Sequence, residues 1–247
     1  MKTFGLIGKN ISYSFSRNYF YEKFKNLNIK NAQYINFELD NLNNLNELFN
    51  NKNYGFNVTI PYKETIILYL DSLDYHAQNI GAVNTIKLIN GQNVGFNTDW
   101  IGFLKSIKPL LKTHHTKALI LGTGGASKAI MYALKQLNIE YLIISRNGSV
   151  TYEDLSEEVL KNHTIIINCT PLGTHPNITQ APNIPYKYIT TNHLAYDLVY
   201  NPSETLFLQK CKQQGATIKN GLEMLEIQAE ESWNIWNSED NFVNKNL

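Results

Sequence analysis

Short apolar runs alternate with helix-length segments along most of the chain. In the first hundred residues, apolar runs predict strands near residues 3–8, 33–37, 55–59 and 84–89. Between them lie helical patterns such as 17–27, where Tyr19, Phe20, Phe24 and Leu27 recur on one face. The pair Asn90-Gly91 predicts a tight hairpin turn, and the polar stretch 41–53 predicts a loosely held helix. This alternation is typical of an α/β protein with parallel strands linked by helical crossovers.

The strands predicted beyond Lys117 are more continuously apolar, at 118–121, 141–144, 164–168 and 194–199. Such runs are expected in a sheet that is covered on both faces, so they indicate a second domain. Residues 99–111 predict a connecting helix. Residues 222–236 predict an amphipathic helix, which carries Leu222, Leu225, Ile227 and Trp233, and we expect this helix to pack on the first domain. We therefore expect a first domain of residues 1–99, completed by the helix in 222–247, and a second domain of residues 100–221.

Composition narrows the classes of function. With 247 residues and 43% apolar content the chain can bury a core, and its net charge of +1 includes no basic stripe for nucleic acid or anionic lipid. The apolar start is too short for a signal peptide and no stretch approaches the roughly 18 apolar residues of a membrane span, so we expect a cytoplasmic protein. Cys169 and Cys211 lack metal-ligand spacing and are interpreted as reduced, structural thiols.

A glycine-rich loop separates a predicted strand from a predicted helix. The apolar run 118–121 leads into this loop, and a helical segment, 128–137, follows it. Glycines at such a turn let the backbone approach a pyrophosphate, and the free amides of the helix N-terminus favour an anion. A tight turn without a ligand is the alternative. The expected dinucleotide-binding residues of the loop are Gly122, Thr123, Gly124, Gly125, Ala126 and Ser127.

The end of the next predicted strand indicates which dinucleotide binds. An NAD enzyme usually has a carboxylate there, whereas this chain has Ser145, Arg146 and Asn147. Only Arg17 and Arg146 among the 22 basic residues are arginine, and a guanidinium can grip a 2′-phosphate with two parallel hydrogen bonds. The sequence therefore predicts NADP, with a solvated surface charge as the alternative for Arg146.

Three polar residues of the first domain are candidates for chemistry on a carbonyl. The segment 57–63 predicts a strand that ends at Thr59 and a helix that starts at Pro61, with Lys63 in its first turn. A cation there opposes the helix dipole, which suits a proton donor, although charged side chains also occur in first turns without a role. Asp99 follows a strand and is compatible with a helix N-cap, and Asn84 is compatible with an ordinary turn.

Five segments together resemble the shikimate dehydrogenase family: 57–63, 81–85, 95–99, 122–127 and 221–228. The resemblance covers nearly the whole chain, and its combination of Asn-Val-Thr-x-Pro-x-Lys with Asn-Thr-Asp is more specific than the glycine loop. It implies a substrate domain and a Rossmann-like, doubly wound NADP domain with the active site in the cleft. It further implies reversible, metal-free reduction of 3-dehydroshikimate to shikimate with NADPH in chorismate biosynthesis, by a monomer or homodimer.

The resemblance also implies roles for single residues. Lys63 would supply or accept the proton, while Asp99 would orient it and hold a substrate hydroxyl. Asn84 and Thr59 would bind the ring, and Tyr200, in the stretch Asp197-Leu198-Val199-Tyr200-Asn201-Pro202, would complete the pocket with Gln228. Ser14 and Ser16 would grip the carboxylate. Thr170 and Gly221 would contact the cofactor, Gly221 near the nicotinamide.

Several of these positions have simpler readings or depart from the family. Taken alone, Ser14 and Ser16 are compatible with turn residues and Gln228 with an exposed helix position. The chain has Tyr13 and Arg17 where the family commonly has His and Pro. Arg17 is compatible with stronger binding of the substrate carboxylate and equally with a surface role. An oxidative quinate/shikimate dehydrogenase and a non-catalytic sensor of shikimate-type ligands are the rival functions. Retention of both Lys63 and Asp99 argues against the sensor.

Overall fold

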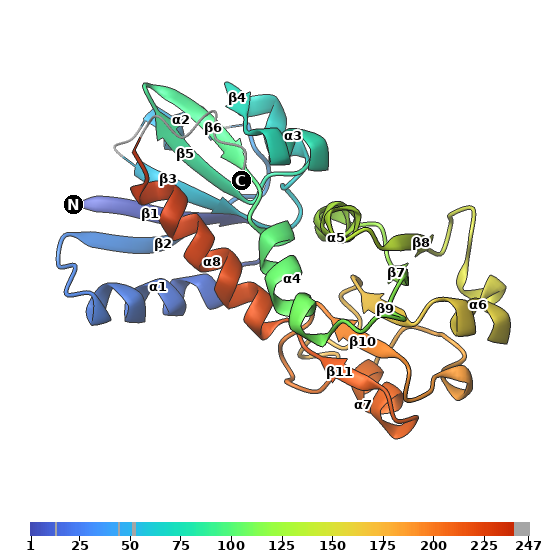
Figure 1. Ribbon diagram of the computed structural model, residues 1–247. Helices are drawn as coiled ribbons and strands as arrows, with labels where there is room; N and C mark the ends of the chain where they lie inside the picture. Colours follow the sequence, from blue (N-terminus) through green and yellow to red (C-terminus); the bar gives the residue numbers. More distant parts are fainter. Residues whose placement is uncertain (13, 44, 51–52, 240–247) are drawn as a thin grey trace. The chain divides into compact units, whose positions relative to one another are not determined.

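The computed structural model describes residues 1–12, 14–43, 45–50 and 53–239 (Figure 1). Tyr13, Asn44, residues 51–52 of the predicted polar helix and residues 240–247 lie outside this set. The chain forms two compact units, one of Met1–Thr98 with Ala229–Leu247 and one of Asp99–Gln228.

A six-stranded sheet forms the centre of the first unit, in the order β2-β1-β3-β5-β6-β4. Strands β1 (Lys2–Gly8), β2 (Ala32–Glu38) and β3 (Asn53–Val58) are parallel. The hairpin of β5 (Thr85–Ile89) and β6 (Gln92–Phe96) is antiparallel to β3, and β4 (Ser72–Leu73) pairs with β6. Asn90 and Gly91 both have positive φ, at 52° and 82°, which confirms the predicted turn.

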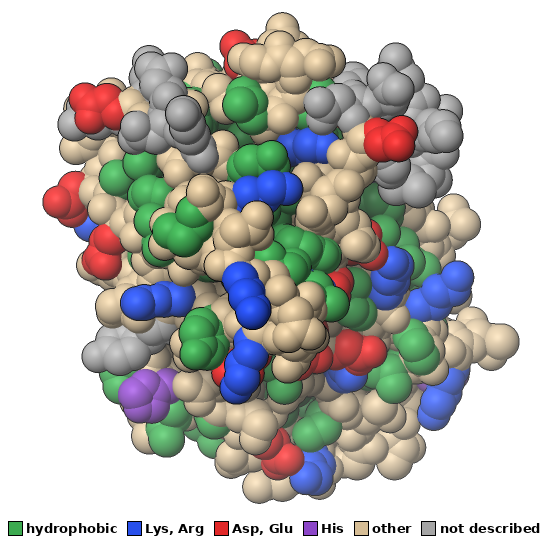
Figure 2. Space-filling view, turned by 90° about the vertical axis from the view of Figure 1, so that its left-hand side faces the viewer, with side chains coloured by type: hydrophobic (Ala, Val, Ile, Leu, Met, Phe, Trp, Pro, Cys, Tyr) green, Lys and Arg blue, Asp and Glu red, His purple; other side chains and the backbone are tan. Residues whose placement is uncertain are grey.

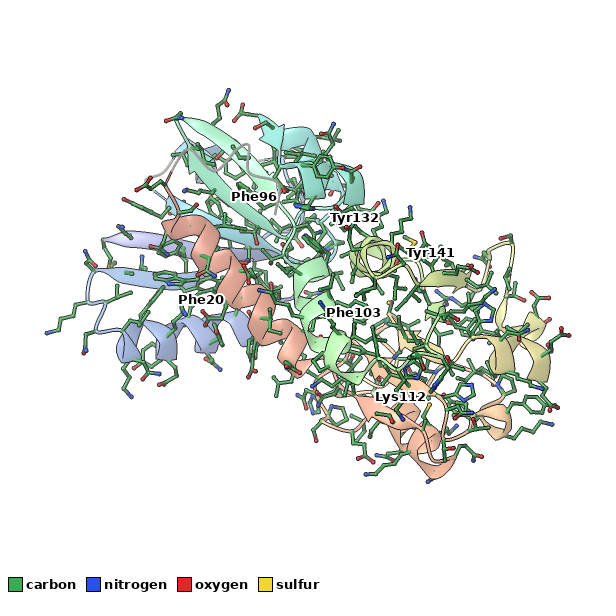
Figure 3. All side chains as sticks on the ribbon, in the orientation of Figure 1. Phe20, Phe96, Phe103, Lys112, Tyr132 and Tyr141 are labelled. Carbon is green, nitrogen blue, oxygen red and sulfur yellow. The ribbon has the colours of Figure 1, made fainter. Side chains whose placement is uncertain are left out.

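Helices cover both faces of this sheet. One apolar cluster joins Ile7 and Val58 of the sheet to α2 (Leu45–Asn50), the 3₁₀ helix η1 (Thr65–Tyr69) and α3 (Tyr75–Ile80). The other joins Phe4 to α1 (Phe15–Asn26) and to α8 (Leu222–Asn237). Phe20 of α1, labelled in Figure 3, belongs to this second cluster, and its ring centroid lies 5.3 Å from that of Trp236. The predicted helix within 41–53 is thus α2, and its Leu45 is fully buried.

The last helix buries only part of the face that its apolar residues suggest. Trp233 packs against the cluster around Phe4, as predicted. Leu222 is exposed and Leu225 and Ile227 are half-buried. The residues that are buried recur every four positions, as expected for one face of a helix. They are Met224, Gln228, Ser232 and Trp236, and Ala229 is buried beside them.

A five-stranded sheet, all parallel, forms the centre of the second unit in the order β11-β10-β9-β7-β8. Its strands are β7 (Lys117–Leu121), β8 (Glu140–Ile144), β9 (Ile165–Asn168), β10 (Leu194–Asp197) and β11 (Thr217–Lys219). Alternate residues of the strands enter two apolar clusters: Ile120 and Ile167 face one side, while Leu119 and Ile166 face the other. This confirms the prediction of a sheet buried on both faces.

Five α-helices, one of them shared with the first unit, accompany the second sheet. Helix α4 (Asp99–Ile107) replaces the longer helix predicted for 99–111, because Pro109 has no amide hydrogen to continue an α-helix and a 3₁₀ turn, η2 (Lys108–Leu110), follows instead. Trp100 of α4 packs edge-on against Tyr132 of α5 (Gly125–Gln136). The shorter α6 (Glu157–Asn162) and α7 (Leu206–Gln213) follow, together with the first turns of α8.

The surface carries charged side chains of both signs (Figure 2), and neither cysteine forms a disulfide. Acidic and basic side chains are interspersed on the face seen in Figure 2. Across the described ranges, no helix is both long and apolar enough to span a bilayer. Cys169 and Cys211 are free thiols, and burial raises the pKa of both.

Candidate active site

The candidate residues of the first unit gather at one edge of its sheet. Thr59 follows the carboxyl end of β3, and its amide donates to the carbonyl of Ile7 near the end of β1. Asn84 precedes β5, which runs antiparallel to β3, so it lies at the same edge. The backbone ties Lys63 to this edge as well, since the amide of Val83 donates to the Lys63 carbonyl at 2.7 Å. Candidates from two separate segments, Thr59 and Lys63 from one and Asn84 from the other, are thus brought together.

Lys63 does not occupy the first turn of a helix, so that prediction is wrong. Pro61 follows a cis peptide bond within a turn, in which the amide of Tyr62 donates to the carbonyl of Thr59 at 2.9 Å. Helix η1 begins only at Thr65. The argument from the helix dipole therefore does not apply to Lys63, and the case for it rests on its place at the sheet edge.

Asn84 belongs to a buried hydrogen-bond network. Its amide nitrogen donates to the Thr98 hydroxyl at 2.9 Å, and its amide oxygen accepts from the Thr98 backbone at 2.7 Å. The neighbouring Asn57 donates to the Asn84 carbonyl and accepts from the hydroxyl of Tyr34 at 2.8 Å. A buried amide that is held by this many partners has one fixed orientation, which suits a group that must present itself to a hydroxyl.

The two serines of the early segment lie at the start of α1. Ser14 is the N-cap residue, yet its hydroxyl caps no amide, and that buried oxygen has no hydrogen-bond partner. Ser16 is buried and hydrogen-bonds the hydroxyl of Tyr34, whose pKa is raised by burial. Arg17, one position further, is exposed on α1. An unpaired, buried hydroxyl is unusual enough to require a reason, and ligand binding supplies one.

Two candidates of the second unit lie on α4 and α8. Asp99 is buried and is the first residue of α4, one position after the N-cap. Gln228 is buried rather than exposed, and its amide donates to the Leu225 carbonyl at 2.8 Å. Gly102 explains how the helices approach: a Cβ there would lie 2.6 Å from the carbonyl oxygen of Met224 and 3.2 Å from the Gln228 Cβ. The absence of this Cβ lets Gln228 lie beside Gly102, which is three residues from Asp99 on α4.

The glycine loop joins β7 to α5 as predicted. Gly122 has a φ of 106°, which a residue with a side chain rarely adopts, and a Cβ there would lie 3.0 Å from the Thr170 methyl group. Gly124 is the N-cap of α5, no side chain caps the helix, and the space beside its Cα is open. Ser127 secures the loop by donating to the Gly124 carbonyl at 2.6 Å. An open, uncapped helix N-terminus after a strand fits a pyrophosphate.

The residues for the 2′-phosphate follow β8. Arg146 is exposed in the turn after the strand, with Ser145 before it and Asn147 after it. Tyr152 interacts electrostatically with this guanidinium. Burial raises the pKa of the Tyr152 phenol, and the positive charge of Arg146 partly offsets the rise. Because β8 pairs with β7, the turn lies beside the end of the strand that leads into the glycine loop.

The remaining candidates complete the carboxyl edge of the second sheet. Thr170 follows β9, and Tyr200, whose pKa is raised by burial, follows β10. Gly221 follows β11, and its amide donates to the Val199 carbonyl at 3.2 Å. Strand order changes direction between β7 and β9, and ligands of doubly wound sheets bind at such a point.

Sequence reasoning gave no role to two polar residues at this edge, Asn168 and Asp197. Both are fully buried at the ends of apolar strands, and burial raises the pKa of Asp197 to about 6, despite hydrogen bonds that lower it. The available signal was a polar residue that ends an otherwise apolar strand. Within the described part of the chain, no three His, Cys, Asp or Glu side chains lie close enough to hold a metal ion.

Comparison with known proteins places the chain in a family. The profile described as "Shikimate dehydrogenase substrate binding domain" matches residues 6–86. A shikimate dehydrogenase (NADP(+)) from Clostridium botulinum (strain Hall) is 40% identical over 96% of this chain and 96% of its own length. This chain belongs to the shikimate dehydrogenase family.

Solved structures agree with this assignment. The shikimate dehydrogenase of Aquifex aeolicus superposes with a TM-score of 0.85 at 34% identity, over 97% of this chain and 94% of that one. The enzyme of Thermus thermophilus, solved in complex with NADP(H) and shikimate, gives a TM-score of 0.84 at 28% identity, over 96% and 94%. The predicted fold class, an N-terminal substrate domain and a Rossmann-like domain, is thereby confirmed.

Proposed function

We propose that this protein is an NADP-dependent shikimate dehydrogenase, which reversibly reduces 3-dehydroshikimate to shikimate in chorismate biosynthesis. The observation that carries the proposal is the 40% identity to a shikimate dehydrogenase (NADP(+)) along nearly the whole of both chains. The geometry supports it, since Thr59, Lys63 and Asn84 lie at one edge of the first sheet, and the candidates for cofactor binding lie at the carboxyl edge of the second. We place the protein in the cytoplasm, as a monomer or homodimer.

The second unit would hold the cofactor. The backbone of Gly122–Ser127 would receive the pyrophosphate at the open N-terminus of α5, and Arg146 would grip the 2′-phosphate with support from Ser145 and Asn147. Thr170 and Gly221 would lie along the rest of the dinucleotide. When bound, NADPH would supply the hydride for the carbonyl carbon.

The first unit would hold the substrate and exchange the proton. Ser14 and Ser16 would bind the carboxylate, and Thr59 and Asn84 would bind ring hydroxyls, with Tyr200 and Gln228 contributing from the second unit. Lys63 would donate a proton to the oxygen on which negative charge develops, with Asp99 as its partner and as an acceptor for a substrate hydroxyl. In the oxidative direction Lys63 would take that proton back.

The decisive experiment measures NADP⁺ reduction by the purified protein with shikimate, in parallel with quinate and with NAD⁺. Rapid turnover with shikimate and NADP⁺ alone is expected. Turnover with quinate of similar kcat/KM would instead make the protein a quinate/shikimate dehydrogenase. Saturable binding of shikimate without turnover would overturn the enzymatic function in favour of a sensor.

A further inference from the structure

Asp197 places a carboxylate in the interior of the second unit, where it is fully buried. Three donors surround it: the Asn168 amide and the Val199 backbone amide each reach Oδ1 at 3.0 Å, and the Thr205 hydroxyl reaches Oδ2 at 2.5 Å. All three donors are neutral. Burial of a carboxylate among neutral donors costs stability relative to a neutral side chain, and the raised pKa of Asp197, about 6, reflects that cost.

The contact with Asn168 leads toward the expected cofactor site. Asn168 and Asp197 are direct partners across the parallel pair β9–β10. A carboxylate can only accept, so the Asn168 amide must turn its nitrogen toward Asp197 and its oxygen away. That oxygen accepts from both the backbone amide and the hydroxyl of Thr170, at 3.0 and 2.6 Å. Thr170 in turn packs against Gly122 of the glycine loop.

The contact with Val199 leads toward the expected substrate residue Tyr200. The same Oδ1 atom that fixes Asn168 accepts from the Val199 amide, one residue before Tyr200. The Val199 carbonyl then accepts from Gly221 at the start of α8. One oxygen atom thus fixes two segments that leave neighbouring strands.

We propose that Asp197 is a positioning residue, whose carboxylate holds the cofactor-facing segment at Thr170 and the substrate-facing segment at Tyr200 in a fixed relation within the second unit. The inference rests on the proposed function, because that function gives Thr170 and Tyr200 their ligands. The third contact is with Thr205, the N-cap residue of α7, whose hydroxyl accepts from the Leu208 amide. It provides an internal control.

The test compares four variants by KM and kcat, after melting curves have shown that each is folded. Asn168→Ala frees Thr170 alone and should raise KM for NADP⁺ roughly tenfold, the effect of about one lost hydrogen bond, while KM for shikimate stays within about twofold. Asp197→Ala frees both segments and should raise both KM values by about that factor. Thr205→Val should change neither KM. Asp197→Asn retains the carbonyl oxygen at Oδ1 and should stay within about threefold of the wild type for both.

Two results would overturn the inference: an equal rise of both KM values in Asn168→Ala, or wild-type KM values in folded Asp197→Ala. If Asp197→Ala does not fold, the KM values of Asn168→Ala, Asp197→Asn and Thr205→Val still test the inference. A wild-type protein that does not oxidise shikimate would count against the proposed function instead. In that case, titration calorimetry with NADP⁺ independently tests the connection from Asp197 through Asn168 to Thr170. Unchanged affinity for NADP⁺ in Asn168→Ala would overturn that part of the inference.

Discussion

The amide nitrogen of Asn57 donates a 2.9 Å hydrogen bond to the hydroxyl of Ser232, across 175 residues of sequence. Asn57 lies on β3, and Ser232 lies on the buried face of α8. The Ser232 hydroxyl also lies 2.7 Å from that of Thr85. The last helix therefore completes a polar network inside the first unit as well as an apolar core.

Removal of the Ser232 hydroxyl should destabilise the protein. Ser232→Ala leaves the fully buried amide and hydroxyl groups around it with one partner fewer, a loss of about 1–3 kcal/mol in the free energy of unfolding. Urea denaturation measures the loss. Asn234→Ala, at an exposed position of the same helix, should stay within about 0.5 kcal/mol of the wild type. Equal stabilities for the two variants would show that the network contributes nothing measurable.

Lys63→Ala tests the proposed proton transfer. Loss of a general acid should lower kcat by roughly 10²- to 10⁴-fold, while KM for shikimate changes by only a few fold. Steady-state kinetics of shikimate oxidation distinguish the two effects. Lys30→Ala removes an exposed lysine and should leave both constants unchanged. A large rise in KM with normal kcat would make Lys63 a binding residue instead.

Arg146→Ala tests the proposed choice of cofactor. A guanidinium that binds the 2′-phosphate through charge-assisted hydrogen bonds should be worth about 1.5–3 kcal/mol, so KM for NADPH should rise about 10- to 100-fold. KM for NADH, which lacks the phosphate, should change little. The only other arginine, Arg17, is exposed on α1, and Arg17→Ala is the matched control. Equal losses for NADPH and NADH would exclude a 2′-phosphate contact.

The buried carboxylate of Asp197 predicts a stability that depends on pH. Its pKa is about 6 in the folded protein against 3.8 as the ordinary value, so between these values the native state binds more protons than the unfolded state. Stability from this group is therefore highest below about pH 4 and falls as pH rises toward 6, by roughly 3 kcal/mol in total.

Asp197→Asn isolates this effect, because the neutral amide cannot titrate. The difference in free energy of unfolding between Asp197→Asn and the wild type should move in favour of the variant by up to about 3 kcal/mol from pH 4 to pH 7. Taking the difference cancels groups that titrate in both proteins, such as His115, whose pKa is lowered mainly by burial. A difference that does not vary with pH would mean that Asp197 stays charged throughout.

Local patterns predicted most of the strands and the glycine loop, because a continuous apolar run followed by glycines depends on neighbouring residues alone. They missed β4 and β11, which have only two and three residues and are too short to show a pattern. The error at Pro61 arose because a proline suits both the first turn of a helix and a tight turn, and the sequence does not distinguish the two. The face of α8 was misjudged for another reason: Gln228 and Ser232 are polar, so a hydrophobic pattern assigns them to solvent. Only the partners provided by the sheet and by α4 account for their burial.

The relation between Asn168 and Asp197 lay beyond sequence reasoning for a similar reason. They are separated by 29 residues and become partners through the register of β9 and β10. Register follows from the packing of whole strands against helices, which no short motif contains. The sequence therefore located the candidate segments, and the three-dimensional pairing identified the residues that orient them.

The division of α8 between the two units has a consequence for synthesis on the ribosome. The part that covers Phe4 and Phe20 begins at Ala229, and all of residues 99–228 are translated between it and the sheet that it covers. At about 5–20 residues per second, the first unit waits on the order of ten seconds with this apolar face covered by α1 alone. The nascent chain should therefore be a client of chaperones until its last helix emerges, although the second unit can already fold.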